Sequence, residues 1–359
     1  MKILLNGATG GTNFGDFLFA EIFQNCTENI VGKENVYWYE SRYQMSDFFK
    51  KHLGYQYKKY NLNDIDALVC ISGGYFCGND KTYRDYFIRY WRYFRICLKC
   101  IRKKIPIAII GLEVAQSKNI LIDRIQKYIL NHAHVITVRN KQSLEQLEKY
   151  GVHFGVCTAD TAHTILTTLN FQKNQNANKM LGRRSLFFHV QLSDIDMAQR
   201  VISVLNQFLD SHREYDVYVG TDQLHNRFDE LDMLAGQINA SQVTVLPYDY
   251  PVEFCSVLSQ MDFLITPKLH VGIVGATLSK SVVSFSVHSY KIQRFYHQLS
   301  ADERSLSMND FSEEKALEMM EKFHDMPLIV PDDVLKASYD NLDCLESFIK
   351  SLYCDSVDR

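Results

Sequence analysis

The sequence lacks any long hydrophobic segment. None of its apolar runs approaches the roughly 20 residues that a helix needs to cross a bilayer, so we expect no membrane-spanning helix. Near the amino terminus an apolar run covers only Ile3–Leu5 before glycines begin, which is too short for the apolar region of a signal peptide. These absences predict a cytoplasmic protein.

Neither sign of charge is in excess. The chain has 39 Lys and Arg against 42 Asp and Glu, a net charge of −3, and 46% hydrophobic residues, which is ordinary for a globular protein. This balance excludes binding of a polyanion over the whole surface, so an anionic ligand would need a local patch. No RNA- or DNA-binding module is present either, and we expect no nucleic-acid partner.

The cysteines form no paired framework. There are nine, an odd number, and several lie inside apolar runs, as Cys70 does, which is typical of reduced and buried thiols. Cys97 and Cys100 have the spacing of a metal site, but no second pair of ligands is near them in the sequence. We therefore favour an ordinary helix face and predict no metal site.

The 359 residues exceed what one compact core usually holds, so two domains are expected. Short apolar runs alternate with helical patterns, which predicts an α/β protein with parallel sheets and helices on both faces. Residues 171–185 belong to a stretch rich in Asn, Gln and Lys that reads as a linker. The predicted division is a first domain at 1–170, a second at 186–311, and carboxyl-terminal helices at 312–359.

The most informative segment spans residues 261–299. An apolar strand ends at Thr266, Lys268 and His270 follow, and small residues lead into a second apolar strand and then Lys291. Ligands of open α/β sheets bind at the carboxyl ends of strands, and a cation beside an imidazole suits an anionic ligand that also needs a proton moved. In the simpler alternative, His270 is a structural histidine and Lys291 lies on a solvated helix start.

Other strand ends also carry glycine or charged residues. The loop at 6–16, NGATGGTNFGD, could bring backbone N–H groups to an anion, or it could be a tight turn with Asn13 and Asp16 as turn former and helix cap. It does not match G-x-G-x-x-G. Further strand ends carry Gly73 and Gly74, Glu113, Arg139, and Asp160. Together they predict one shared crevice.

Residues 81–104 predict a helix with one basic and one aromatic side. The basic side holds Arg92, Arg95, Lys99 and Arg102, and the other side holds Tyr86, Tyr90, Phe94, Cys97 and Ile101. The aromatic side is expected to face the core while the basic side is solvated. The alternative is peripheral docking on the inner face of an anionic membrane.

Taken in order, these loops resemble the polysaccharide pyruvyl transferase family. Five patterns of that family have similar counterparts across roughly residues 1–300. They are G-N-x-G-D, a glycine-rich loop, an arginine before a helix, Asp-x-Ala, and Arg-Leu-His followed by a strand and a lysine. The counterparts are Thr12–Asp16, Ser72–Gly74, Arg139–Leu144 with Gly151, Asp160–Ala162, and Lys268–His270 with Lys291.

The resemblance implies two Rossmann-like domains facing each other across a cleft, as in GT-B glycosyltransferases. It also implies transfer of pyruvate from phosphoenolpyruvate to a sugar as a ketal, usually bridging two hydroxyls of one hexose. The family acts on bacterial capsule, exopolysaccharide or cell-wall glycans and has eukaryotic members. Phosphoenolpyruvate would be the donor substrate, with no cofactor, and the 81–104 helix would suit a lipid-linked acceptor.

The resemblance also suggests roles for the candidate residues. His270 would protonate the donor's methylene, and Asp16 or Glu113 would be the base for the acceptor. The donor-binding candidates are Lys268, Leu269, Lys291 and Gln191, and the acceptor-binding candidates are Asn13, Gly73, Gly74, Arg139 and Asp160.

Two positions depart from the family pattern. Lys268 replaces an arginine, which keeps the charge but loses the bidentate fork. Gln191 or His189 occupies a region where many members have an arginine, for which Arg183 or Arg184 could substitute. Two other functions therefore stay open. One is a glycosyltransferase that uses a nucleotide sugar, with Pro247–Asp249 near the ribose, and the other is a non-catalytic glycan-binding subunit.

Overall fold

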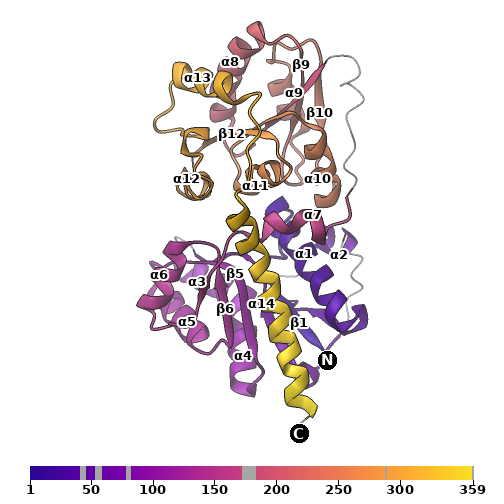
Figure 1. The fold of residues 1–359 in the computed structure, drawn as a ribbon, viewed down its shortest axis with the longest axis vertical. Helices are drawn as coiled ribbons and strands as arrows, with labels where there is room; N and C mark the ends of the chain where they lie inside the picture. The colour runs from indigo at the N-terminus through magenta and orange to yellow at the C-terminus, as the bar shows by residue number, and fades with distance from the viewer. Residues whose placement is uncertain (41–45, 53–58, 78–81, 172–182, 288, 358–359) are drawn as a thin grey trace. The chain divides into compact units, whose positions relative to one another are not determined.

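The computed structural model describes residues 1–40, 46–52, 59–77, 82–171, 183–287 and 289–357. The chain forms two compact units, each with its own sheet (Figure 1). The first unit comprises Met1–Thr12, Asp16–Leu169 and Asp332–Arg359, and the second comprises Asn13–Gly15 and Asn170–Pro331. Of the predicted linker at 171–185, residues 172–182 lie outside the described residues.

The sheet of the first unit is parallel throughout its described pairings. Its order is β2-β1-β3-β5-β6-β7, with β4 also paired to β5. The strands are β1 (Ile3–Asn6), β2 (Val36–Trp38), β3 (Ala67–Cys70), β4 (Gly73–Phe76), β5 (Ile107–Val114), β6 (Val135–Val138) and β7 (Val156–Cys157). Parallel strands covered on both faces are apolar along their whole length, which is why β1 and β3 were recognisable as continuous apolar runs.

The helices of the first unit include the last helix of the chain. They are α1 (Phe14–Val31), whose first two residues belong to the second unit, α2 (Asp47–His52), α3 (Tyr83–Arg89), α4 (Arg95–Lys103), α5 (Ile120–Asn131), α6 (Lys141–Lys149), α7 (Ile165–Thr168) and α14 (Asp332–Val357). Shorter helical turns are η1 (Lys33–Asn35), η2 (Leu62–Asp64), the π-helical η3 (Tyr90–Phe94) and η4 (Thr161–Thr164).

Helix α14 is anchored to the first sheet by a buried asparagine. The Asn341 side-chain oxygen accepts hydrogen bonds from the hydroxyls of Thr137 (2.6 Å) and Thr158 (2.8 Å), and its amide nitrogen donates to the Ala159 carbonyl (2.9 Å). The carboxyl-terminal segment expected at 312–359 is therefore divided, because α14 belongs to the first unit while α13 (Glu313–Phe323) belongs to the second.

Two of the predicted loops are strands. Gly73 and Gly74 lie in β4, which continues the line of β3 along β5 after a two-residue interruption. Glu113 lies inside β5, which runs on to Val114 through an irregularity between Ile109 and Leu112. Sequence-based prediction ends a strand at a glycine, so it does not detect a strand that continues past a bulge.

The second unit contains a six-stranded parallel sheet in the order β10-β9-β8-β11-β12-β13. In chain order this is 3-2-1-4-5-6, the arrangement of dinucleotide-binding Rossmann folds, whose order reverses between the first and fourth strands. The strands are β8 (Arg184–His189), β9 (Tyr215–Gly220), β10 (Val243–Leu246), β11 (Phe263–Thr266), β12 (Ser281–Ser286) and β13 (Ser305–Ser307).

Side-chain alternation assigns the helices of the second unit to two faces. Leu186, Phe188 and Ile265 pack in one core with α8 (Ile195–Ser211), α9 (Phe228–Ala235) and α13. Phe187, His189 and Thr266 point to the other face because successive strand residues alternate. That face is covered by α10 (Pro251–Gln260) and α11 (Leu269–Thr277), and α12 (Ser289–Gln298) contacts β12 and α11.

Close packing of α11 depends on a small residue. A side chain at Gly275 would come within 2.4 Å of Leu264 Cδ1 in β11 and 2.9 Å of Val282 Cγ2 in β12. The small residues after His270 therefore let α11 lie directly on the sheet.

The helical region expected at 81–104 is described from residue 82 onward. Phe94, Cys97 and Cys100 are buried in the first unit's core, and Tyr86 and Ile101 pack against that core. This confirms the core-facing aromatic side and explains Cys97 and Cys100 as buried helix residues. In the described ranges, no helix has both the length and the hydropathy needed to span a membrane.

A buried histidine predicts one pH effect on stability. Burial lowers the pKa of His163 in η4 to about 4, although Asp160 raises it. Between pH 6.5 and 4 the unfolded chain binds a proton that the folded chain excludes, so the free energy of unfolding should fall by about 3 kcal/mol as the pH drops through this range. Urea unfolding of the wild type and His163→Gln across this range measures the effect. An identical pH slope in the variant would contradict it.

Candidate functional site

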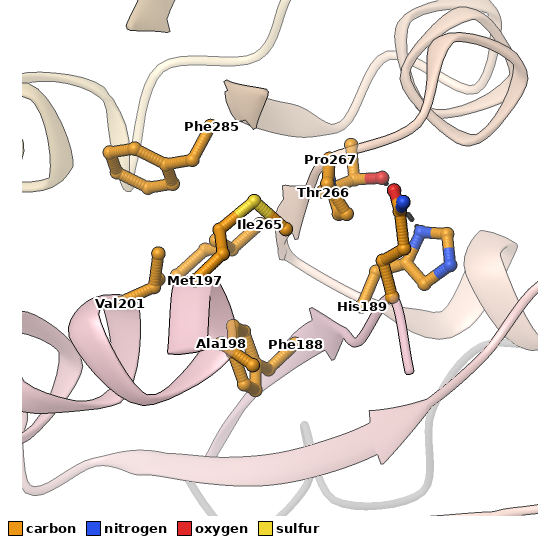
Figure 2. Close-up of a pocket in the computed structure, with 10 residues that line it drawn as sticks. Phe188, His189, Met197, Ala198, Val201, Ile265, Thr266, Pro267 and Phe285 are labelled. Carbon is orange, nitrogen blue, oxygen red and sulfur yellow. Dashed lines mark hydrogen bonds between the residues drawn. The ribbon is translucent and has the colours of Figure 1, made fainter. Parts of the chain in front are cut away.

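The candidate site of the second unit lies where its strand order reverses, between β8 and β11. The last residues of these strands meet there, because His189 Nδ1 and the Thr266 hydroxyl lie 2.8 Å apart (Figure 2). Thr266 also accepts a hydrogen bond from the backbone N–H of Lys268 (3.0 Å). This point in an open α/β sheet is where ligands bind.

An aspartate beyond the end of β9 organises the polar side chains. Asp222 is buried, and its Oδ1 lies 3.5 Å from His189 Nε2 and 3.9 Å from Lys268 Nζ. Burial alone would raise the pKa of Asp222, but His189, Lys268 and His270 outweigh it and lower the pKa. The aspartate is therefore held as a carboxylate, which lets it orient Lys268 and the imidazole of His189.

Residues Asn13–Gly15 also belong to this site. Asn13 donates from Nδ2 to Asp222 Oδ2 (3.2 Å), and the Phe14 backbone N–H donates to the Asp222 carbonyl (2.8 Å). Phe14 is further held by ring contacts with Tyr248 and Phe254. A side chain at Gly15 would come within 1.8 Å of His270 Nδ1, so the glycine is what lets the imidazole lie against the backbone of this loop.

The amino end of α11 is suited to an anion. Lys268 is its N-cap residue and His270 lies in its first turn; within the described chain, no side chain caps this helix end and no acidic residue lies in its first turn. The first N–H groups of a helix and its dipole favour negative charge. The Lys268 side chain is 28% exposed, so its ammonium can reach both Asp222 and a ligand.

The remaining candidates for binding the donor substrate lie at the start of α11, just beyond β8 and in α12. Leu269 is the first residue of α11. Gln191 lies just beyond β8 and donates to the Ser193 hydroxyl (2.8 Å). It lines a cavity of about 10 Å³ with His189 and Thr266, which has room for about one water molecule. Lys291 is exposed in the first turn of α12.

The two arginines upstream of β8 do not substitute for the missing arginine. Arg183 precedes the strand and Arg184 is its first residue, so both lie at the edge of the sheet opposite His189. There Arg183 contacts Asp216, and Arg184 contacts Asp325 (2.7 Å). Lys268, whose Nζ lies 3.9 Å from Asp222 Oδ1, is a fixed cation of this site.

In the first unit, three predicted site residues form a buried ion network. Arg139 contacts Glu113 Oε2 (2.6 Å) and Asp160 Oδ2 (2.8 Å), and all three residues are less than 10% exposed. Burial alone would lower the pKa of Arg139, but the two carboxylates outweigh it and raise the pKa. The sequence predicts that these three residues share one crevice, and the structure does bring them together. However, their burial favours a structural role over acceptor binding or base catalysis.

Asp16 is the more accessible of the two candidate bases. It is half-buried in the first turn of α1. Its carboxylate adds to the effect of burial in raising the pKa of Tyr93, which places the two side chains near each other within the first unit. Gly73 and Gly74 lie in β4 as part of the sheet and not in an open loop.

Sequence reasoning missed Asp222 and the role of Thr266. Asp222 lies just beyond a strand end, at Val219-Gly220-Thr221-Asp222, which is the kind of position that singled out Asp160. Its importance comes from Asn13, which is 209 positions away in the chain, and no local pattern indicates that pairing.

Several solved structures resemble the whole chain. S. aureus MnaA, in a co-structure with UDP, has a TM-score of 0.63 at 13% identity over 98% of this chain and 97% of that chain. UDP-GlcNAc 2-epimerase from Methanocaldococcus jannaschii has 0.63 at 12% over 96% and 99%. MurG from Acinetobacter baumannii has 0.56 at 10% over 98% and 100%. At these identities the likeness shows the fold alone, and it confirms a GT-B-like protein with two parallel α/β units.

Within that class, the sequence identifies the family. The model of the polysaccharide pyruvyl transferase family matches residues 13–289. The match spans most of the chain, from the Asn13 loop to the first residue of α12, and the protein belongs to this family. Among curated proteins, no sequence is significantly similar to it.

Proposed function

We propose that this protein transfers pyruvate from phosphoenolpyruvate to a sugar of a bacterial surface or cell-wall glycan, forming a pyruvate ketal and releasing phosphate. The observation that carries the proposal is the amino end of α11 at the point where the sheet order reverses. It combines Lys268, His270 and the helix dipole, which suits a small ligand with a phosphate and a carboxylate. Because phosphoenolpyruvate is a cytoplasmic metabolite, the proposal places the reaction in the cytoplasm.

In the proposed reaction His270 is the proton donor. His270 protonates the donor's methylene carbon, which becomes a methyl group, while an acceptor hydroxyl forms a bond to C2 and gives up its proton to a base. A second hydroxyl of the acceptor then attacks C2, the bond from C2 to the phosphate oxygen breaks, and phosphate leaves with the second proton. The group we propose as the base is Asp16, which follows Gly15 directly in the chain. No cofactor is needed for these steps.

Asp222 and Lys268 set the charge of the proposed donor site. Asp222 offsets part of the cationic charge of Lys268. Lysine provides a point charge, whereas the family arginine can donate two parallel hydrogen bonds to one anionic group. In this protein the N–H groups of α11 would donate the second hydrogen bond. This supports keeping phosphoenolpyruvate as the donor despite the replacement.

The main alternative is a nucleotide-sugar glycosyltransferase, because the names of fold neighbours refer to UDP and UDP-GlcNAc. Two features weigh against it. In Rossmann folds the pyrophosphate binds at the start of the first helix, but here the Asp194 carboxylate caps α8 by accepting from the Met197 N–H (3.1 Å), and Asp196 follows. Asp249, the candidate for the ribose, is exposed beyond the end of the edge strand β10.

Product analysis tests the proposed reaction. Purified full-length protein is incubated with phosphoenolpyruvate and a panel of glycans that have free hydroxyl pairs. We expect phosphate release and a product heavier by one pyruvate minus one water. Release of UDP from a UDP-sugar without ketal formation would instead identify the glycosyltransferase. Glycan binding without turnover of either donor would identify the non-catalytic alternative.

A lipid-linked acceptor and membrane contact through 81–104 form a separate part of the proposal. Tyr83 and Phe87 of α3 are exposed. Burial together with Arg95 and Arg102 lowers the pKa of Lys99, which shows that the basic side chains of α4 are crowded. Flotation of the protein with vesicles of anionic phospholipid tests this contact, and absence of flotation would assign the helix to the core alone.

A further inference from the structure

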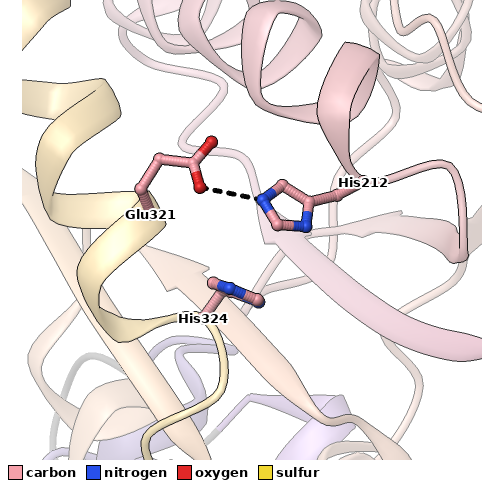
Figure 3. Close-up of side chains that lie close together, drawn as sticks. All are labelled: His212, Glu321 and His324. Atoms are coloured by element: carbon pink, nitrogen blue, oxygen red, sulfur yellow. Dashed lines mark hydrogen bonds and ion pairs between the residues drawn. The ribbon is translucent and has the colours of Figure 1, made fainter.

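Two histidines and a glutamate converge in the second unit, at the edge of the sheet opposite His189 and Thr266. His212 follows α8 as its C-cap, Glu321 lies in the last turn of α13, and His324 is the C-cap of α13 (Figure 3). One potential ligand atom from each residue lies within 4.8 Å of the others. None of the three belongs to the proposed pyruvyl transfer site.

One nitrogen of His324 contacts a hydroxyl. His324 Nδ1 lies 3.1 Å from the Tyr215 hydroxyl, which also lies 3.3 Å from the His324 carbonyl oxygen. In the tautomer whose Nδ1 donates to this hydroxyl, Nε2 carries the lone pair that a metal ion requires.

His212 lies between two carboxylates. Its Nδ1 is 3.3 Å from Glu214 Oε1, and its Nε2 is 2.9 Å from Glu321 Oε2. Carboxylates accept hydrogen bonds, so both nitrogens face acceptors. A metal ion between Nε2 and Glu321 satisfies this arrangement, because Glu214 then holds the Nδ1 proton. A carboxylate that orients a metal-bound histidine in this way is a recurring feature of zinc sites.

The surroundings also favour a cation. Two helices, α8 and α13, end at the cluster, and helix carboxyl ends attract positive charge. The nearby cation Arg184 is paired with Asp325 (2.7 Å) and lies over the Tyr215 ring. Counting Glu214, Glu321 and Asp325 against Arg184 leaves a net charge of −2 at the cluster, which matches a divalent ion.

We propose that His212, His324 and Glu321 bind Zn²⁺, with water in the fourth position. Two imidazoles and one carboxylate are a ligand set that zinc prefers, at bond lengths of about 2.0–2.1 Å. Tetrahedral ligands at those lengths lie about 3.3 Å apart. His212 Nε2 and Glu321 Oε2, now 2.9 Å apart, would therefore move slightly apart, while any pair near the 4.8 Å limit would close by up to about 1.5 Å. The ion would link the carboxyl end of α13 to that of α8.

The test is metal binding by the full-length protein after treatment with a chelator. Calorimetry with Zn²⁺ should show one site per chain, and the melting temperature should rise with Zn²⁺ concentration. His212→Ala and Glu321→Gln should weaken Zn²⁺ binding at least about 100-fold, and Glu214→Gln about 10–100-fold. The matched control is His297→Ala, because His297 is 82% exposed and also contacts a carboxylate, that of Asp302 (3.1 Å). It should bind Zn²⁺ like the wild type.

Co²⁺ distinguishes this cluster from the cysteines. The Co²⁺-loaded protein should show d–d absorption without the near-ultraviolet band of thiolate-to-cobalt charge transfer. Glu321→Gln keeps the size of the side chain, so it reports on binding even if His212→Ala fails to fold. Wild-type affinity in Glu321→Gln, a thiolate band, or no binding at all would overturn the proposal and leave His212 as a structural histidine between two carboxylates.

Discussion

Replacing His270 with glutamine is expected to reduce pyruvyl transfer by about 100- to 10,000-fold, because glutamine cannot donate the proton that the donor's methylene carbon requires. Glutamine also retains hydrogen-bonding capacity beside Gly15, where the imidazole now lies. The fold should therefore persist, and calorimetry should show phosphoenolpyruvate binding within a few-fold of wild type. Steady-state phosphate release over a range of donor concentrations measures the loss, which should fall on kcat.

The contrast with Lys268→Met separates proton transfer from binding. Removing this cation should raise KM for phosphoenolpyruvate, since Lys268 is proposed to contact the donor's negative charge and not to move a proton. If His270→Gln keeps wild-type kcat, His270 has no role as an acid. If it loses donor binding as fully as Lys268→Met does, its role is in positioning the donor.

Most of the fold could be predicted because parallel strands buried on both faces leave continuous apolar runs. The runs at 67–70 and 263–266 coincide with β3 and β11, in which every residue is buried. The failures have a common cause. Strand β4 begins with two glycines, and β5 passes through an irregularity before Glu113, so the local sequence predicts a loop at both places. What stabilises these segments is pairing with a neighbouring strand, which local composition does not report.

The candidate site was predictable to a similar degree. Lys268 and His270 are near neighbours in sequence at a strand end, so their proximity required no tertiary information. The interactions that hold them do require it. Asp222 joins the end of β9 to the Asn13 loop, and His189 joins β8 to β11. Such pairings follow from the strand order of the sheet, which a single sequence does not specify.

Replacing Arg139 with methionine is expected to lower the free energy of unfolding by about 3–5 kcal/mol, because Glu113 and Asp160 would be left buried without their cation. Urea denaturation followed by circular dichroism measures this loss. The loss should shrink toward low pH, where the two carboxylates are neutralised on protonation.

Glu113→Gln is the informative comparison. It leaves Arg139 paired with Asp160 at 2.8 Å, so it should cost less stability than Arg139→Met. Combining the two changes should restore part of the loss, since only one unpaired carboxylate then remains. This pattern would assign the three residues to the framework of the first unit. A stability change below about 1 kcal/mol in Arg139→Met, the range of an exposed pair, together with weaker glycan binding, would show instead that Arg139 and Asp160 contact the acceptor.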